Sequence, residues 1–147
     1  MQLEIRDARR NDINQLLELY TNLHDNPIPL IDDRIKAVWN KIIDDRDHHI
    51  ILGCLNEKII SSCVLVVIPN LTHNQRPYAL VENVVTHEKY RNRGYASAVL
   101  DYAERVAKDN DCYKIMLLTG SKEKSTLDFY RKAGFNSEDK TAFIQWL

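Results

Sequence analysis

The sequence predicts an α/β domain built around a mixed β-sheet, and three observations carry this prediction. Apolar periodicities follow the chain in the order strand, two helices, three strands, helix, strand, helix and strand. No repeat, linker or low-complexity run interrupts that order. The 147 residues suffice for one hydrophobic core and leave little room for a second. We therefore expect a single domain that spans residues 1–147.

The first strand and the first two helices come from the N-terminal third of the chain. Residues 2–6 alternate between polar and apolar side chains, as in a short strand. Asp12 and Gln15 have the spacing of a capping box, which predicts the start of a helix. Two apolar stripes with helical spacing follow, separated by a break at residues 26–29. The first stripe consists of Ile13, Leu16, Leu17, Tyr20 and Leu23, and the second of Ile35, Val38, Trp39, Ile42 and Ile43.

Three β-rich runs occupy the middle of the chain. Residues 49–55 and 59–68 are joined by Asn56-Glu57-Lys58, which predicts a β-hairpin. A polar loop at residues 69–77 leads to the third run, residues 79–86.

The last third of the chain predicts a helix, a strand, a short helix and a closing strand. Residues 114–119 are typical of a buried strand, and residues 142–147 predict the last strand of the sheet. Ser125 and Asp128 predict a cap for the short helix, which Gly134 ends. The longer helix has an apolar face made of Tyr95, Val99, Tyr102, Ala103 and Val106.

Composition excludes several classes of function. The chain has 21 acidic residues against 20 lysines and arginines, so no global field favours nucleic acid. The longest apolar stretch, residues 63–68, is far too short to span a membrane. Three cysteines without a Cys-x-x-Cys motif are typical of reduced thiols, which predicts a cytoplasmic protein. The histidines His48, His49, His73 and His87 lack close carboxylate or cysteine partners at the spacing of metal ligands, so we expect no metal.

The stretch Arg91-Asn92-Arg93-Gly94-Tyr95-Ala96 joins a strand to the start of a helix. The first N–H groups of a helix lack partners and carry partial positive charge. Gly94 lets the backbone approach a large anion, and the two arginines add charge beside those donors. The stretch therefore predicts a pyrophosphate cradle; the alternative is a solvated turn that merely contains arginines.

Three motifs resemble the GNAT superfamily of N-acetyltransferases. Arg91-x-x-Gly94-x-Ala96 matches the acetyl-CoA loop of that family, [Q/R]-x-x-G-x-[G/A]. Residues 81–86 match the strand before the loop, and residues 129–135 match the helix and turn F-Y-x-x-x-G-F. The resemblance implies a mostly antiparallel central sheet flanked by helices, and acetyl-CoA as co-substrate. It implies a cofactor site made of Val84, Val85, Thr86, Arg91, Asn92, Arg93, Gly94, Tyr95, Ala96, Ser97 and Thr126.

Within this family the chain looks most like glucosamine-6-phosphate N-acetyltransferases. The likeness lies in residues 82–86 and in the run Asp111-Cys112-Tyr113-Lys114-Ile115. Three places depart from that pattern: Asn83 replaces an aspartate, residues 118–121 replace the acidic end of the fifth strand, and Thr126 replaces an asparagine. We therefore do not carry the sugar-phosphate substrate over, and expect only a small-molecule amine acceptor.

Two side chains are candidates for the chemistry. Glu82 interrupts an apolar strand, and partial burial there would raise its pKa toward neutrality, as a general base requires. The alternative is a glutamate at an exposed sheet edge or in an ion pair. The resemblance implies that Tyr130 protonates the departing thiolate, and that the backbone amide of Val84 or Val85 binds the oxyanion. The alternative for Tyr130 is a core aromatic.

The resemblance leaves open what the site does beyond acetyl-CoA binding. The leading prediction is direct transfer of acetyl to the primary amine of a small molecule. The alternatives are a non-catalytic acyl-CoA sensor and a protein or peptide N-acetyltransferase. Residues 23–33 and 69–78, the two irregular stretches with prolines, are the predicted walls of the acceptor site. Family members are often dimers, so a homodimer is one state that the resemblance allows.

Overall fold

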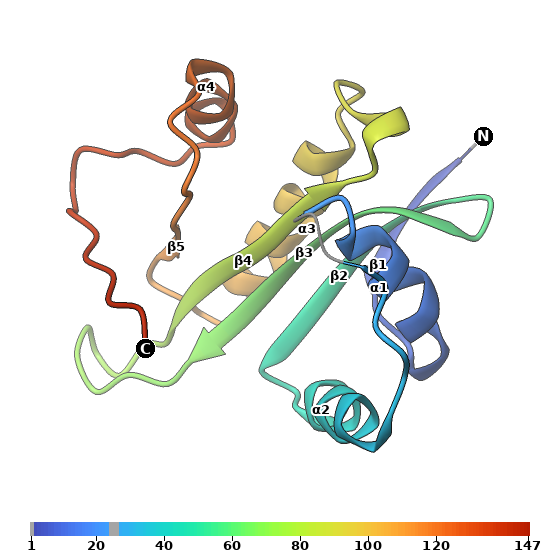
Figure 1. Cartoon of the computed structure of the whole chain (residues 1–147). Helices are drawn as coiled ribbons and strands as arrows, with labels where there is room; N and C mark the ends of the chain where they lie inside the picture. The colour runs from blue at the N-terminus through green and yellow to red at the C-terminus, as the bar shows by residue number, and fades with distance from the viewer. Residues whose placement is uncertain (1, 24–26) are drawn as a thin grey trace.

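A five-stranded sheet in the order β1-β2-β3-β4-β5 organises the fold, in a computed structural model that describes residues 2–23 and 27–147 (Figure 1). The first three pairs of neighbours are antiparallel, and β4 and β5 are parallel. The predicted mixed, mostly antiparallel sheet is therefore confirmed. The strands are β1 (Leu3–Asp7), β2 (His48–Leu55), β3 (Lys58–Ile68), β4 (Tyr78–Thr86) and β5 (Ile115–Leu117).

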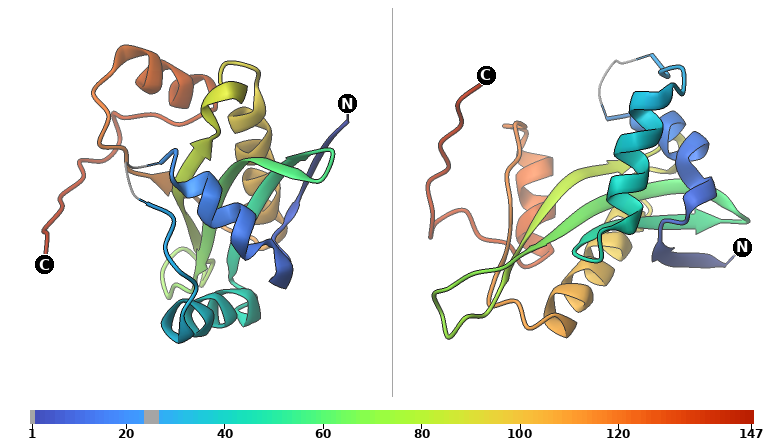
Figure 2. Two further views of the ribbon diagram at one scale, coloured as in Figure 1. Left: turned by 45° about the vertical axis from the view of Figure 1, so that its right-hand side comes forward. Right: turned by 90° about the horizontal axis from the view of Figure 1, so that it is seen from below.

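Helices pack on both faces of this sheet. One face carries α1 (Ile13–Tyr20) and α2 (Asp33–Asp44), and the other carries α3 (Tyr95–Asp109), as Figure 2 shows. The short helix α4 (Lys124–Lys132) follows β5. Two single turns of 3₁₀ helix, η1 (Arg10–Asp12) and η2 (Glu88–Tyr90), precede α1 and α3. No helix in the described part of the chain is long and apolar enough to cross a membrane.

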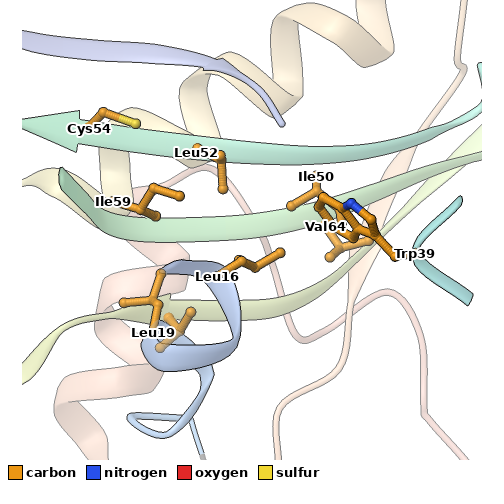
Figure 3. Packing of buried hydrophobic residues seen from close by; sticks show 9 residues of the cluster. Leu16, Leu19, Trp39, Ile50, Leu52, Cys54, Ile59 and Val64 are labelled. Carbon is orange, nitrogen blue, oxygen red and sulfur yellow. The ribbon is translucent and has the colours of Figure 1, made fainter. Parts of the chain in front are cut away.

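Two apolar clusters hold these layers together. The first lies under α1 and α2, where Leu16, Leu19 and Trp39 meet side chains of β2, β3 and β4 (Figure 3). The second lies under α3, where Val99, Leu100 and Ala103 meet the other face of the same strands. Both clusters depend on strand alternation, because successive side chains of a strand point to opposite faces.

The β2–β3 hairpin forms as predicted, but the capping box does not. Asn56 and Glu57 have positive φ angles of 48° and 66°, which is the backbone of a two-residue type I′ turn. Gln15 does not cap its own helix: its Oε1 accepts from the amide of Ile59 at 3.0 Å. The side chain therefore fastens α1 to the hairpin, a long-range contact that a local spacing rule cannot indicate.

Asp12 is the acidic residue buried beneath the start of α1. Its carboxylate accepts two hydrogen bonds from Arg6, at 2.7 and 3.0 Å, and one from the amide of Arg9 at 2.6 Å. Burial alone would raise the pKa of Asp12, but these donors hold it below the ordinary aspartate value of 3.8. The ion pair therefore stabilises the junction of β1 and η1 while the carboxylate is charged.

The two C-terminal strands differ from the predictions. The strand expected at residues 114–119 is shortened to Ile115–Leu117, and the strand expected at 142–147 is absent from the described structure. The chain leaves α4 through a turn in which Gly134, at φ 96°, donates to Arg131 and Phe135 donates to Tyr130. Residues 136–147 then project from the domain (Figure 2) with no sheet neighbour in the described residues.

We predict that Asp12→Asn lowers the free energy of unfolding by about 3 kcal/mol, because it leaves the Arg6 guanidinium poorly paired in a partly buried site. Since the pKa of Asp12 is lowered on folding, its contribution is complete at neutral pH and is lost as the pH falls through 3.8 and below. Urea unfolding at pH 7 and pH 3 should therefore show a smaller difference between variant and parent at pH 3.

The matched control is Asp44→Asn, which breaks the exposed ion pair between Asp44 and Arg10. It should cost less than about 1 kcal/mol. Equal losses in the two variants would show that the burial of Asp12 has no energetic consequence.

Candidate active site

The pairing of β4 with β5 ends halfway along β4. Only residues Ala79–Val81 pair with Ile115–Leu117, whereas β4 continues to Thr86. From Glu82 onward, the edge of β4 that faces away from β3 therefore has no strand neighbour among the described residues. Backbone groups along an unpaired edge are free to bind a ligand. We call this interval, bounded by residues 82–86 of β4 and by the chain after Leu117, the β4–β5 split.

A β-bulge coincides with the start of the split. Val64 lies opposite Glu82 and Ser62 lies opposite Val85, so that Cys63 alone faces both Asn83 and Val84. Asn83 has a left-handed φ of 50°. The extra residue reverses the alternation of β4, because Val81 packs in the cluster under α3 whereas Val85 packs in the cluster under α1. The bulge therefore turns the backbone of β4 where the pairing with β5 stops.

Glu82 lies on the sheet face that carries α1 and α2. Its partner across the ladder is Val64, a member of the cluster on that face, and directly opposite residues share a face. The side chain is exposed, so the partial burial expected from the sequence is wrong. The physical reason is local: Glu82 is the first residue of β4 beyond the paired segment of β5, so β5 does not flank it. The carboxylate is therefore open to an acceptor molecule and to water.

Tyr20 lies over the bulge and was predicted only as part of an apolar stripe. Burial raises the pKa of Tyr20 to about 12, with the side chains of Asn83 and Ser62 beside its hydroxyl. Its ring packs against the cluster under α1. Tyr20 therefore contributes a buried, protonated hydroxyl next to Asn83, a role that no pattern in the sequence indicates.

Tyr130 contacts the other apolar cluster, the one under α3. Its ring lies 5.0 Å from that of Phe129 and 6.3 Å from that of Phe135, between centroids. Burial raises the pKa of Tyr130, and the thiol of Cys63, which belongs to the same cluster, acts in the same direction. The hydroxyl therefore stays protonated at neutral pH. Thr126 lies one helical turn earlier on the same face of α4.

The predicted cradle has the backbone of an anion site. Gly94 is the N-cap of α3, with a left-handed φ of 82°, and no side chain caps the helix. A Cβ placed on Gly94 would meet nothing within 4 Å, so open space lies beside it. Within the described residues, the amides of Tyr95, Ala96 and Ser97 make no hydrogen bond, and the first turn carries no acidic residue. These amides can therefore receive an anion.

Cationic side chains surround Tyr90, next to the cradle. The Arg93 guanidinium lies 5.9 Å and the Lys58 ammonium 5.7 Å from the centroid of the Tyr90 ring. Lys58 comes from the β2–β3 hairpin, far away in sequence, and the sequence analysis missed it. The positive charge near the start of α3 therefore comes from Lys58 as well as from the arginines of the preceding loop.

The sequence predicts Arg91 as a positive charge beside the helix amides, whereas in the structure its side chain also has partners within the chain. Its Nε donates to the carbonyl of Thr86 at 3.2 Å, and its Nη2 donates to the carbonyl of Asn22 at 3.3 Å. The side chain of Asn22 in turn accepts from the amide of Glu88 at 3.0 Å. Arg91 and Asn22 therefore fasten the loop before α3 to the end of α1, and part of the guanidinium is engaged within the chain. No sequence signal marks Asn22.

The histidines have other partners. His49 Nδ1 lies 3.2 Å from Asp7 Oδ1, and the His73 ring stacks on Tyr113 with centroids 3.9 Å apart. Among the residues that the structure describes, no group of three histidine, cysteine or acidic side chains could hold a metal ion.

Comparison with known proteins agrees with this architecture. Residues 12–135 match the acetyltransferase (GNAT) family. Glucosamine 6-phosphate N-acetyltransferase of Trypanosoma brucei brucei is 29% identical over 143 residues, covering 94% of this chain and 92% of that protein.

Solved structures resemble the whole chain. A candidate acetyltransferase from Agrobacterium tumefaciens str. C58 has a TM-score of 0.90 at 35% identity, covering 97% of this chain and 99% of that one. Glucosamine-6-phosphate N-acetyltransferase from Arabidopsis thaliana has a TM-score of 0.85 at 19% identity, with 99% of each chain covered, and shares the fold.

We predict that Gly94→Val weakens CoA binding by at least about tenfold, because its branched side chain would occupy the open space beside the helix amides. Isothermal titration calorimetry of CoA with the folded variant measures the effect.

The matched control is Gly134→Val. Gly134 also has a positive φ, 96°, and also has open space where a Cβ would lie, but it ends α4. Both variants should lose stability through backbone strain, of order 1 kcal/mol or more. Only Gly94→Val should lose CoA affinity, and equal affinities in both variants would exclude the cradle.

Proposed function

Because the chain belongs to the acetyltransferase (GNAT) family and is an acetyl-CoA-dependent N-acetyltransferase, we propose that it acetylates the primary amine of a small molecule by direct attack on the thioester. The observation that supports this proposal is the β4–β5 split, which begins at Glu82 and leads along β4 toward the anion cradle at Gly94. An extended thioester cofactor needs a slot of this kind, with an anion site at one end and free amides beside the reacting group.

In the proposal, the pyrophosphate of acetyl-CoA lies on the amides of Tyr95, Ala96 and Ser97, and the pantetheine arm follows the unpaired edge of β4 past Thr86. The acetyl group then reaches the bulge. The amide of Val84 or Val85 donates to the thioester oxygen, whose negative charge grows during attack. Ser61 supports this geometry, since its buried hydroxyl donates to the carbonyl of Val85 at 3.1 Å and so holds the β4 backbone in place.

Glu82 is the proposed general base. An ammonium with a pKa of about 10.4 is almost fully protonated at pH 7, so its lone pair is available only after a proton is removed. The exposed carboxylate of Glu82, at the start of the split, can accept that proton directly or through a water molecule. Because the Glu82 carboxylate is exposed, an acceptor can reach it. For the same reason, burial does not make this carboxylate a stronger base.

Tyr130 is the proposed general acid. It packs against the cluster under α3, whereas Glu82 lies on the face of α1 and α2, so the two side chains flank the split from different sides. A thiolate leaving toward α4 would meet a phenol whose raised pKa keeps its proton available. In the proposal, proton removal and proton donation therefore take place on opposite sides of the thioester.

The acceptor is proposed to bind between the two irregular stretches named above, residues 23–33 and 69–78; residues 24–26 lie outside the described residues. Arg76 lies in the second stretch, where it is a candidate to bind an acidic group of the acceptor. In the structure it already has partners: its Nε donates to the Asp111 carboxylate at 3.1 Å and its Nη2 to the carbonyl of Cys112 at 3.2 Å. Because the Trypanosoma relative carries the name of an amino-sugar phosphate acetyltransferase, amino-sugar phosphates should be tried first.

The test is release of free CoA thiol from acetyl-CoA in the presence of amines. The panel contains amino-sugar phosphates, free amino sugars, aminoglycosides and peptides with a free α-amine. The proposal expects turnover with at least one small amine and no comparable turnover with peptides. CoA binding with no thiol release from any amine would instead favour the sensor, and peptide turnover alone would favour a protein-modifying enzyme.

We predict that Glu82→Gln lowers kcat about 10²–10⁴-fold at pH 7 and that high pH partly restores it, because the amine then loses its proton without help. The Kd for acetyl-CoA should stay unchanged. Glu104→Gln, a change of the same type on α3, serves as the control. Parental turnover of Glu82→Gln across the pH range would assign proton removal to another group.

For Tyr130→Phe we predict a fall in kcat of roughly 10–10³-fold with nearly constant Kd for acetyl-CoA, since only an interaction made in the transition state is lost. Tyr102→Phe, which removes a hydroxyl that donates to Asp7 at the other end of the sheet, is the matched control. Melting temperatures are measured alongside. Unchanged kcat together with a lowered melting temperature would leave Tyr130 as a packing residue.

A further inference from the structure

Two adjacent serines of β3 are fully buried, and they differ in their hydrogen bonds. Ser61 and Ser62 are both 0% exposed. The Ser61 hydroxyl has two partners, the carbonyl of Val85 at 3.1 Å and Thr86 Oγ1 at 2.8 Å. The Ser62 hydroxyl makes no well-formed hydrogen bond with any described residue. Because a buried hydroxyl without a partner is costly, the groups that lie beside Ser62 Oγ matter for the fold.

The polar group beside Ser62 is the hydroxyl of Tyr20. Ser62 lies opposite Val85 and therefore shares the sheet face that carries α1. Tyr20, the last residue of α1, packs against the cluster on that face, and its hydroxyl lies beside the side chains of Ser62 and Asn83. Because burial raises the pKa of Tyr20 to about 12, this hydroxyl keeps its proton at neutral pH. Tyr20 can therefore accept from Ser62 and donate to Asn83 at the same time.

The end of α1 that carries Tyr20 is fixed by its neighbours. Leu19, the preceding residue, is 2% exposed in the cluster under α1. The side chain of Asn22 accepts from the amide of Glu88, and its carbonyl accepts from Arg91. The chain just after Tyr20 is thereby fastened to the loop before α3. The Tyr20 hydroxyl is therefore a fixed point that can orient an exposed side chain.

Asn83 is the exposed residue beside the Tyr20 hydroxyl, and it lies at the bulge. Its left-handed φ of 50° turns the β4 backbone directly after Glu82. The Glu82 side chain makes no hydrogen bond with any described residue, so the position of its carboxylate depends on the backbone that carries it. No strand among the described residues flanks this backbone on the side away from β3. A contact that fixes the Asn83 side chain therefore restricts the direction in which Glu82 leaves the sheet.

We propose that Tyr20 is a positioning residue of the acetyl-transfer site. Its hydroxyl links the buried Ser62 to Asn83, and this link holds Glu82, the residue before Asn83, at the start of the β4–β5 split. The inference rests on the proposed function, in which Glu82 is the general base. Tyr20 itself touches no reacting atom and acts through Asn83. Its position in the sequence marks it only as one member of an apolar stripe, because the link joins α1, β3 and the bulge across the fold.

The first arm of the experiment measures the link by urea unfolding and does not depend on turnover. Tyr20→Phe keeps the ring and removes the hydroxyl, so the buried Ser62 hydroxyl loses its partner and the urea midpoint should fall. In Tyr20→Phe/Ser62→Ala both hydroxyls are absent, and the midpoint should recover part of the loss. A parental midpoint for Tyr20→Phe, or no recovery in the double variant, would show that the two hydroxyls are not linked.

The second arm measures kcat and the Kd for acetyl-CoA in the same variants, with an amine that the parent acetylates. Tyr20→Phe should lower kcat roughly 10–100-fold through misplacement of Glu82, with unchanged Kd. Tyr20→Phe/Ser62→Ala should regain the midpoint but not kcat, since Asn83 still lacks its contact. In a Glu82→Gln background, Tyr20→Phe should lower kcat little further, because the group that it positions is already gone.

Tyr102→Phe is the matched control. It removes a hydroxyl that donates to Asp7, far from the bulge, and should keep the parental kcat. Three results would overturn the proposal: parental kcat in Tyr20→Phe, recovery of kcat together with the midpoint, which would make Tyr20 purely structural, and a full further loss in the Glu82→Gln background. These results leave the proposed function standing. A parent that acetylates no amine would instead contradict that function, and with it the positioning role.

Discussion

The β-bulge opposite Cys63 is the constraint on which the site depends. One extra residue in β4, with Asn83 in a left-handed conformation, exchanges the faces to which β4 directs its side chains. Val85 is thereby free to pack under α1 while Val81 packs under α3, and the β5 ladder stops at Val81. A regular strand would carry the β5 ladder further and close the split. The bulge thus converts a continuous sheet into a sheet with a slot, and the hydrogen bond from the buried Ser61 hydroxyl to the carbonyl of Val85 helps to hold the β4 backbone beyond it.

The two ends of the slot are held by different means. At the cradle, the turn before α3 is fastened to the end of α1 through Asn22 and Arg91, so that the helix amides are positioned before a ligand arrives. Such preorganisation lowers the entropic cost of binding an anion. At the end where we propose that the thioester reacts, Tyr130 is positioned by ring contacts with Phe129 and Phe135, which the turn at Gly134 brings together. Glu82, by contrast, is exposed and makes no side-chain hydrogen bond in the described part of the chain.

The sheet ends at β5. Three paired residues make β5 a short strand, and it is the edge strand among the described residues. A short edge strand is usually weak, because few ladder hydrogen bonds and little apolar contact hold it. The chain that follows β5 bounds the β4–β5 split, so the stability of this strand bears on the geometry of the site.

The sequence alone determined the order of elements from β1 to α4, the hairpin at Asn56-Glu57 and the glycine turn at Gly94 that begins α3, because each rests on a local rule of periodicity, turn conformation or helix termini. It also indicated Glu82 and Tyr130 through their neighbours in the chain. Tertiary structure decided the rest. Gln15, Asn22 and Lys58 act on segments far away in sequence. The exposure of Glu82 follows from where β5 ends, and residues 142–147 have no strand neighbour among the described residues. Local pattern specifies what a segment can become, whereas pairing and burial require partners that only the folded chain supplies.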